Sequence, residues 1–134
     1  PIDFDMDLAK DESKNNPYFY AQYAYVRCCS ILAKSSFNPE DEISLEEISN
    51  CFEIVSKAIN YPLILKEFAL ERSPHSLVHF VKDFSATFHS FYEQNPVLSD
   101  DKITSNSRLL ITSITKLILK NSFKILNVKP LEKM

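Results

Sequence analysis

Hydrophobic residues recur at three- and four-residue steps along most of this 134-residue chain, which is the period of an α-helix with one buried side. The clearest run lies between Ser73-Pro74 and Asn95-Pro96. Its apolar side chains fall on one helical face, and we predict that this face is core. The face comprises Leu77, Phe80, Val81, Phe84, Phe88 and Phe91.

Capping signals mark the starts of two further helices. Asn16 followed by Pro17 predicts a helix start, because asparagine caps the first free amides and proline lacks an N–H that would go unpaired there. This helix should run to about Lys34. Ser44 and Glu47 form a capping box, in which each side chain bonds the other's backbone amide. The box predicts a second helix over Leu45–Ile59.

The rest of the chain predicts two more helices and no paired strands. Asn60 and Pro62 predict a break, and a short helix should follow from Pro62 towards Arg72. The last helix should cover Asn106–Leu126. Its inner side is expected to comprise Leu110, Ile114, Leu117, Ile118 and Ile125. We therefore predict one all-α domain over residues 1–134, an antiparallel bundle of about five helices.

The composition excludes several classes of function. The chain contains no glycine, so glycine-rich nucleotide-binding loops are excluded. Helix ends that need left-handed backbone geometry must then use another residue, and asparagine is the best candidate. The expected positions are Asn60, Asn95 and Asn127.

Cysteine, histidine and hydropathy give expectations about cofactors and location. Three cysteines make an odd count, as expected for free thiols in a reducing compartment. We find no Cys-x-x-Cys pair, and His75 and His79 lack an intervening glutamate, so we predict no metal site. No apolar run approaches the ~20 residues of a membrane span. We expect a monomeric cytoplasmic protein without membrane contact. Because the chain starts at Pro1, we also expect it to be a piece of a longer protein.

Charge is unevenly distributed along the chain. Residues 1–60 hold five basic and eleven acidic side chains, whereas residues 101–134 hold seven basic and two acidic ones. A basic C-terminal third is compatible with a nucleic-acid partner. It is equally compatible with a solvated, lysine-rich helix face.

The first predicted helix carries an aromatic cluster within the stretch NPYFYAQYAYVRCCSIL. Tyr20, Tyr23 and Arg27 are spaced by three and four residues and share one arc of this helix. Phenol rings beside a guanidinium form a platform on which nucleobases stack. Alternatively, the tyrosines cover the edge of the core while Arg27 pairs with a neighbouring acid. Spacing alone leaves both readings open.

Several segments taken in order resemble a known family. They are FDMDLA at residues 4–9, NPYFYAQYAYVRCCSIL, ERSPHSLVHFVKDFSATFHSFYEQNPVL, SRLLITSITKLILKNSFKILNV and the terminal LEKM. Together they resemble the C-terminal anticodon-binding domain of arginyl-tRNA synthetases, often called the DALR domain. Only residues 35–65 match loosely.

The resemblance implies a binding role and a set of residues. The family's tyrosines and arginine in the first helix face the tRNA anticodon loop, an aromatic of the Phe-His-Ser-Phe-Tyr run lines the base pockets, and the C-terminal methionine packs against the loop. These roles carry over to Tyr20, Tyr23, Arg27, Tyr92 and Met134. The implied partners are the anticodon loop of the arginine tRNA and a catalytic domain of the same chain.

The resemblance also implies that the chemistry lies elsewhere. The family joins arginine to its tRNA with ATP and magnesium, but the nucleotide-binding signatures belong to a separate catalytic domain, and neither occurs here. We therefore expect no cofactor and no catalytic residue in this chain. Two departures from the family stand out. Asn127 occupies a place where a glycine is usual, and the four letters of the nickname are not intact at 105–109.

Two other classes of function compete with this interpretation. One is a helical docking module whose aromatic face anchors a protein partner. The other is a small helical enzyme, for which the sequence offers no nucleophile paired with a base. The order of the matched segments favours anticodon binding, because a general docking bundle has no reason to reproduce it.

Overall fold

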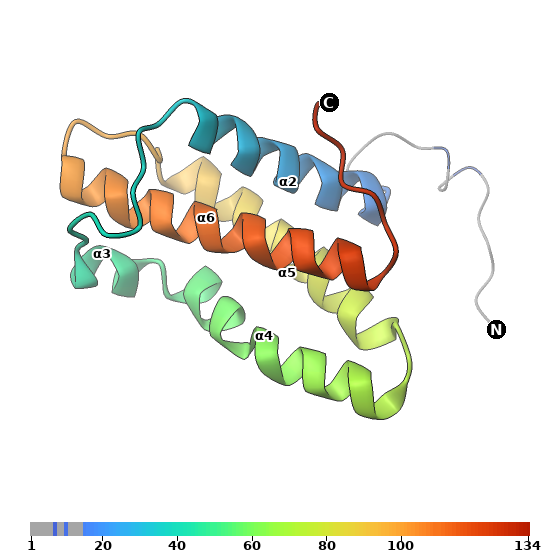
Figure 1. Cartoon of the computed structure of the whole chain (residues 1–134). Coiled ribbons are helices and arrows are strands. Elements are labelled where there is room, and N and C mark those ends of the chain that lie inside the picture. Colours follow the sequence, from blue (N-terminus) through green and yellow to red (C-terminus); the bar gives the residue numbers. More distant parts are fainter. Residues whose placement is uncertain (1–6, 8–9, 11–14) are drawn as a thin grey trace.

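The computed structural model describes residues 7, 10 and 15–134 of the chain, and this part is an all-α bundle. Successive long helices alternate in direction along the bundle, and α2 packs against both α5 and α6 (Figure 1). The helices are α2 (Pro17–Ala33), α3 (Leu45–Asn50), α4 (Phe52–Glu71), α5 (His75–Gln94) and α6 (Lys102–Ile125). The predicted fold class is confirmed, and no strand occurs among the described residues.

Two of the predicted helix starts are confirmed by their caps. The side chain of Asn16 accepts a hydrogen bond from the amide of Tyr18 at 3.0 Å, and Pro17 occupies the first turn of α2. The hydroxyl of Ser44 accepts from the amide of Glu47 at 3.1 Å. Both caps satisfy backbone N–H groups that have no partner inside the helix. The reciprocal half of the predicted capping box is wrong, because the amide of Ser44 donates to the hydroxyl of Ser107 at 2.8 Å and the carboxylate of Glu47 pairs with Arg108.

The predicted break at Asn60–Pro62 is wrong, because α4 continues through Pro62 to Glu71. The interruption lies nine residues earlier, at Cys51, whose amide bonds back to the carbonyls of Glu47 and Ile48 as α3 ends. Pro62 removes one helical hydrogen bond but lies on the exposed side of α4. On the other side Tyr61 is buried, so packing holds the helix together across the proline.

Left-handed backbone geometry occurs at Arg72 and Asn127, with φ of 51° and 56°. The prediction is therefore confirmed for Asn127. It is wrong for Asn60, which lies inside α4, and for Asn95, which is extended with φ of −129°. Because the helix continues past Asn60 and ends at Glu71, the left-handed reversal falls on Arg72 instead.

The predicted core face of α5 is confirmed. Phe84 and Phe88 are completely buried, and the half-buried ring of Phe80 stacks on Phe84 with centroids 5.2 Å apart. The remaining buried members of this face are Leu77, Val81 and Phe91. α5 packs against both α4 and α2, which holds the C-terminal part of α5 next to α2.

The predicted inner side of α6 is wrong except at Ile118. Leu110 is half-buried, and Ile114, Leu117 and Ile125 are exposed. The buried side also holds small hydroxyl residues, each of which donates to the backbone carbonyl four residues back. They are Ser107, Thr112, Thr115 and Ser122, which bond to the carbonyls of Ile103, Arg108, Ile111 and Ile118. Because these hydroxyls form hydrogen bonds within α6, burying them costs little free energy. The prediction considered apolar residues alone and therefore assigned the wrong side of α6 to the core.

The start of α6 also differs from the prediction. The helix begins at Lys102, four residues before the predicted Asn106, because Asp101 caps it by accepting from the amide of Thr104 at 2.8 Å. None of the helices formed by the described residues combines the length and apolar character needed to cross a membrane.

Candidate nucleic-acid interface

The middle of α2 and the end of α5 bring an arginine between two tyrosine rings. The guanidinium carbon of Arg27 lies 4.5 Å from the ring centroid of Tyr23 and 4.3 Å from that of Tyr92. Tyr23 and Arg27 are one helical turn apart on α2, whereas Tyr92 reaches them from α5. The structure thus groups Tyr23, Arg27 and Tyr92 from two helices through cation–π contacts, whereas the sequence predicted a platform of Tyr20, Tyr23 and Arg27 on one helix.

The platform forms one wall of an open groove of about 730 Å³. Tyr23, Tyr92 and Met134 are 43%, 36% and 54% exposed, so each offers an accessible apolar surface at this groove. Tyr20 does not line the groove, and its half-buried side chain lies against His89. The structure therefore brings four of the five predicted site residues to one groove, and the fifth contacts the neighbouring His89.

Arg27 has no carboxylate partner in the described part of the chain. The ion pairs there involve Lys57 and Arg108, so the predicted alternative in which Arg27 pairs with an acid is wrong. Its Nη2 donates to the hydroxyl of Tyr23 at 2.7 Å. Arg27, flanked by two accessible phenol rings and without an ion-pair partner among the described residues, gives the groove a cationic and aromatic wall.

His89 supports this wall from inside the protein. The ring is 4% exposed, and its centroid lies 4.4 Å from that of Tyr20 and 5.4 Å from that of Tyr23. Its Nε2 lies 3.3 Å from the backbone oxygen of Tyr20, and its Nδ1 lies 3.1 Å from Nη1 of Arg27. A carbonyl can only accept and a guanidinium can only donate, so both contacts require a neutral ring with its hydrogen on Nε2.

The surroundings of His89 favour this neutral form. Burial lowers the pKa of His89 below its ordinary value of 6.5. The Tyr20 carbonyl raises the pKa, the Arg27 charge lowers it, and Glu93 raises it, all less strongly than burial lowers it. The imidazole therefore remains neutral at physiological pH.

A buried glutamine brings the end of the chain to the groove. Gln22 is completely buried, and its Nε2 donates to the carbonyl of Lys129 while its Oε1 accepts from the amide of Leu131, both at 2.9 Å. The reversal that starts this segment uses the left-handed Asn127. The segment then runs back along α2, and the end of the chain lies beside that helix (Figure 1). Asparagine thus fulfils the geometric role of the missing glycine.

Sequence reasoning missed His89 and Gln22 as members of the site. Both are polar residues on otherwise buried helix faces, and this position was the sequence feature that could have indicated a specific role. Their partners lie far away in sequence, since 62 residues separate His89 from Arg27 and 107 separate Gln22 from Lys129. Helical periodicity does not report such pairings.

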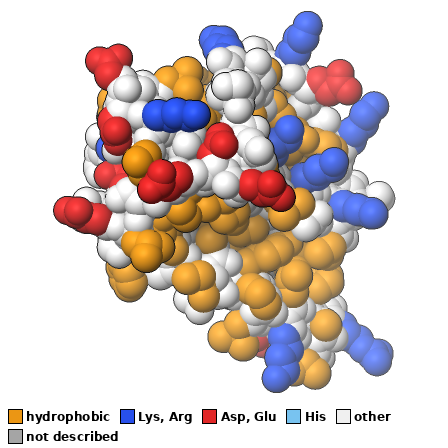
Figure 2. All heavy atoms as spheres, turned by 60° about the vertical axis from the view of Figure 1, so that its left-hand side comes forward, with side chains coloured by type: hydrophobic (Ala, Val, Ile, Leu, Met, Phe, Trp, Pro, Cys, Tyr) orange, Lys and Arg blue, Asp and Glu red, His pale blue; other side chains and the backbone are white. Residues whose placement is uncertain are grey.

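The charge asymmetry of the sequence persists on the surface. On the face shown in Figure 2, most lysine and arginine side chains lie towards one side and most acidic ones towards the other. At the C-terminal end of α6, Lys120, Lys124 and Lys129 border a shallow hollow of about 590 Å³. These lysine side chains are exposed, as both a solvated helix face and a contact with RNA require.

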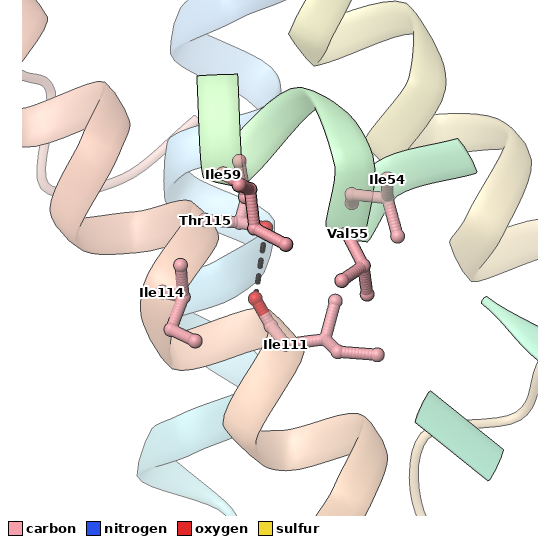
Figure 3. Close-up of a pocket in the computed structure, with 7 residues that line it drawn as sticks. Ile54, Val55, Ile59, Ile111, Ile114 and Thr115 are labelled. Atoms are coloured by element: carbon pink, nitrogen blue, oxygen red, sulfur yellow. Dashed lines mark hydrogen bonds between the residues drawn. The ribbon is translucent and has the colours of Figure 1, made fainter. Parts of the chain in front are cut away.

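A second hollow lies between α4 and α6 and is almost wholly apolar. Ile54, Val55 and Ile59 of α4 face Ile111 and Ile114 of α6 across about 170 Å³ (Figure 3). The hydroxyl of Thr115 is already used, because it donates to the Ile111 carbonyl at 2.9 Å. With no ionisable lining residue, this hollow offers no acid–base or nucleophilic chemistry.

Metal chemistry has no support in the described residues. No group of three or more histidine, cysteine or acidic side chains lies close enough to hold an ion there. His75 and His79, the spaced pair considered above, are both exposed at the start of α5.

Comparison with known proteins identifies the fold and the family. A family model described as the DALR anticodon binding domain matches residues 21–134. The chain therefore belongs to the DALR anticodon binding domain family. This agrees with an all-α bundle that presents an aromatic and cationic groove.

The matched relatives are arginine–tRNA ligases. The enzyme of Chlorobium phaeovibrioides is 33% identical over 142 residues, which cover 99% of this chain and 26% of that protein. The arginyl-tRNA synthetase structure from Plasmodium falciparum is 33% identical, with a TM-score of 0.78 over 98% of this chain and 23% of that one. The Thermus thermophilus structure, at 23% identity and a TM-score of 0.82, covers 99% of this chain and 24% of that one and supports the fold. The chain spans about a quarter of the length of these relatives.

Proposed function

We propose that this chain is the anticodon-binding part of an arginine–tRNA ligase and that it positions the tRNA for arginylation by a catalytic domain outside the chain. Family membership supports the parent enzyme. The groove supports the binding role, because anticodon bases are unpaired and can stack on aromatic side chains. In this proposal ATP and magnesium act in the catalytic domain, and the protein works in the cytoplasm as a monomer.

One observation carries the proposal: Arg27 lies between the accessible rings of Tyr23 and Tyr92, and Met134 lines the same groove. Stacked bases would use the exposed faces of the two phenols. Arg27 would supply the positive charge and hold the rings in place. Tyr20 would act indirectly, as the backing against which this wall rests.

The test is Tyr23→Ala in the intact ligase. Since Tyr23 is exposed, the variant should fold, and its tRNA affinity should fall by about 1–3 kcal/mol per lost stacking contact. The measurements are equilibrium tRNA binding and KM for tRNA, with thermal unfolding as the check on folding. A folded Tyr23→Ala enzyme with unchanged tRNA kinetics would contradict the assignment.

Ala24→Leu is the matched control. Ala24 is the next residue of α2 and is completely buried, so a larger side chain there overpacks the helix contact. We expect Ala24→Leu to lower the unfolding temperature first, with tRNA affinity following only through loss of folded protein. Comparing the Tyr23 and Ala24 variants thus distinguishes a loss of tRNA recognition from a loss of packing.

The isolated chain should bind tRNA much more weakly than the intact ligase. Its net charge is −3, which gives little general attraction to phosphate. The rest of the ligase holds the remainder of the tRNA and raises the effective concentration of the anticodon at the groove. A gel-shift titration of both proteins tests this, and equal affinities would contradict it.

An exposed apolar stripe on α4 gives the catalytic domain a contact surface within the same proposal. Phe52, Ile59, Leu63 and Leu70 recur at helical spacing and are 54–74% exposed. Figure 2 shows exposed apolar side chains gathered in an area that extends along the molecule. Large exposed apolar areas mark contact sites, and about three quarters of each relative lies outside the matched region. We assign this stripe to contact with the remainder of the ligase.

Leu70→Glu tests this contact. In the isolated chain the substitution places a charge in solvent and should leave the unfolding temperature unchanged. In the intact ligase it should loosen the domain contact and lower the unfolding temperature or the arginylation rate. Identical behaviour of mutant and wild-type ligase in both measurements would refute the assignment of the stripe.

A further inference from the structure

The buried ring of His89 connects three parts of the groove wall. It bonds the backbone of α2 at Tyr20, accepts a hydrogen bond from the side chain of Arg27, and stacks on Tyr23 with an interplanar angle of 23°. Each contact uses a different part of the ring: Nε2, Nδ1 and the face. A ring that only filled space would not need both nitrogen contacts, and this observation points to a defined role.

The first step of the inference concerns Arg27. Its two terminal nitrogens have separate partners, Nη1 at His89 and Nη2 at Tyr23. A long arginine side chain loses rotamer freedom when it is held this way. Because both terminal nitrogens form hydrogen bonds, the guanidinium is held between the rings of Tyr23 and Tyr92 before any ligand binds. Such preorganisation lowers the cost of ordering the site upon binding.

The second step concerns the proton. A protonated His89 would place an N–H at Nδ1, facing the donor of Arg27 and a second positive charge. The 3.1 Å contact would then become repulsive, and Arg27 would move from its place between the rings. In the described part of the chain, the charged groups acting on His89 are Arg27 from α2 and Glu93 from its own helix. Glu93 also borders the groove.

We propose that His89 is a positioning residue for tRNA recognition, which holds Arg27 and Tyr23 in the base-receiving arrangement only as the neutral ring with hydrogen on Nε2. The inference rests on the proposed function, since it assigns the support of that same groove. His89 does not line the groove and acts through Arg27. Acidification should therefore weaken tRNA binding before it unfolds the bundle.

Two substitutions divide the roles of the ring nitrogens. In His89→Asn the amide oxygen can take the place of Nδ1 and accept from Arg27, while the bond to the Tyr20 carbonyl is lost. In His89→Gln the amide nitrogen can take the place of Nε2 and bond that carbonyl, while the acceptor for Arg27 is lost. We expect the tRNA affinity of the intact ligase to fall about tenfold in His89→Gln and less in His89→Asn.

The readouts are chosen so that a purely structural role would not produce them. His89→Gln should raise KM for tRNA and leave kcat at saturating tRNA close to wild type. In an Arg27→Ala background, His89→Gln should have no further effect on affinity, because its target is gone. The tRNA affinity of the wild type should fall as the pH drops from 8 to 5.5. His89→Asn should remove the share of this loss that protonation of His89 causes, whereas Glu93→Gln, which keeps His89, should still show it.

The outcomes separate this inference from the proposed function. Weak binding by Tyr23→Ala and Arg27→Ala together with wild-type affinity in folded His89→Gln would overturn the role of His89 and keep the groove. Unchanged binding by all three variants would overturn the groove itself. If His89→Gln does not fold, the pH profile of the wild-type ligase against His89→Asn decides, and identical profiles would overturn the proposal.

Discussion

Individual residues in this chain are placed by partners that a sequence pattern does not reveal. Tyr20, Tyr23 and Arg27 could be grouped from their spacing, but the structure pairs Tyr23 directly with Arg27, while Tyr20 lies against His89. Their dependence on His89 could not be predicted, because periodicity predicts faces within one helix and not the pairing between helices. Left-handed backbone geometry was also only partly predictable. Asn127 could be predicted from its residue type, whereas Arg72 adopts a left-handed conformation that arginine does not favour.

Replacing Arg72 by glycine should stabilise the fold. Arg72 is exposed and left-handed, which costs a non-glycine residue ~1–2 kcal/mol, while glycine pays ~0.5–1 kcal/mol in lost chain freedom. The expected gain is about 0.5–1 kcal/mol in the free energy of unfolding, measured by urea denaturation. Arg72→Ala is the control and should change little, because alanine pays the same backbone cost. Equal gains in both variants would mean that the side chain, not the backbone, is responsible.

The stability of the isolated chain should decrease on acidification through His89. Because burial lowers the folded-state pKa of His89 below 6.5, the unfolded state binds a proton first as the pH falls. Stability is therefore complete above pH 6.5 and is lost progressively as the pH falls below it, until the folded-state pKa is reached. The measurement is the free energy of unfolding against pH. The His89→Asn variant should lack this component, and an unchanged slope would show that another group causes the loss.

At the level of helices, the sequence predicts the strongly apolar α5 better than its neighbours. Phe84 and Phe88 could be assigned to the core because their face is apolar throughout. The buried side of α6 could not, because Thr112 and Thr115 bury hydroxyls that bond their own helix. The continuity of α4 through Pro62 was equally hidden, since it depends on tertiary packing around the proline. Local capping signals predicted the starts of α2 and α3, whereas packing decided the continuity of α4 and the buried face of α6.

Phe84→Ala tests the core assignment of α5. Phe84 is completely buried and stacks on Phe80, so truncation removes apolar contacts and leaves a cavity. The expected loss is about 3–5 kcal/mol in the free energy of unfolding. Phe52→Ala on the exposed stripe of α4 is the control and should cost far less in the isolated chain. A similar small loss in both would mean that α5 does not organise the core.

At the scale of the whole molecule, both ends of the described bundle contribute to one groove. α2 provides Tyr23 and Arg27, α5 provides Tyr92, and the terminal segment provides Met134. In the proposed function, recognition depends on the complete bundle and on how its last residues are tied back to α2. Gln22 makes that tie through two hydrogen bonds to the backbone of the terminal segment. It is the side chain through which the fold can be coupled to the position of Met134.

Gln22→Met tests this coupling, because methionine has a similar length but can make neither hydrogen bond. The bundle should remain folded, with a loss of about 1–3 kcal/mol for the unpaired Lys129 carbonyl and Leu131 amide. Hydrogen exchange at the Leu131 amide should accelerate, since that N–H loses its acceptor. In the intact ligase, tRNA affinity should fall about as far as it does when Met134 is deleted. If deleting Met134 weakens binding while Gln22→Met binds normally, the terminal segment holds its place without Gln22, and the proposed coupling is wrong.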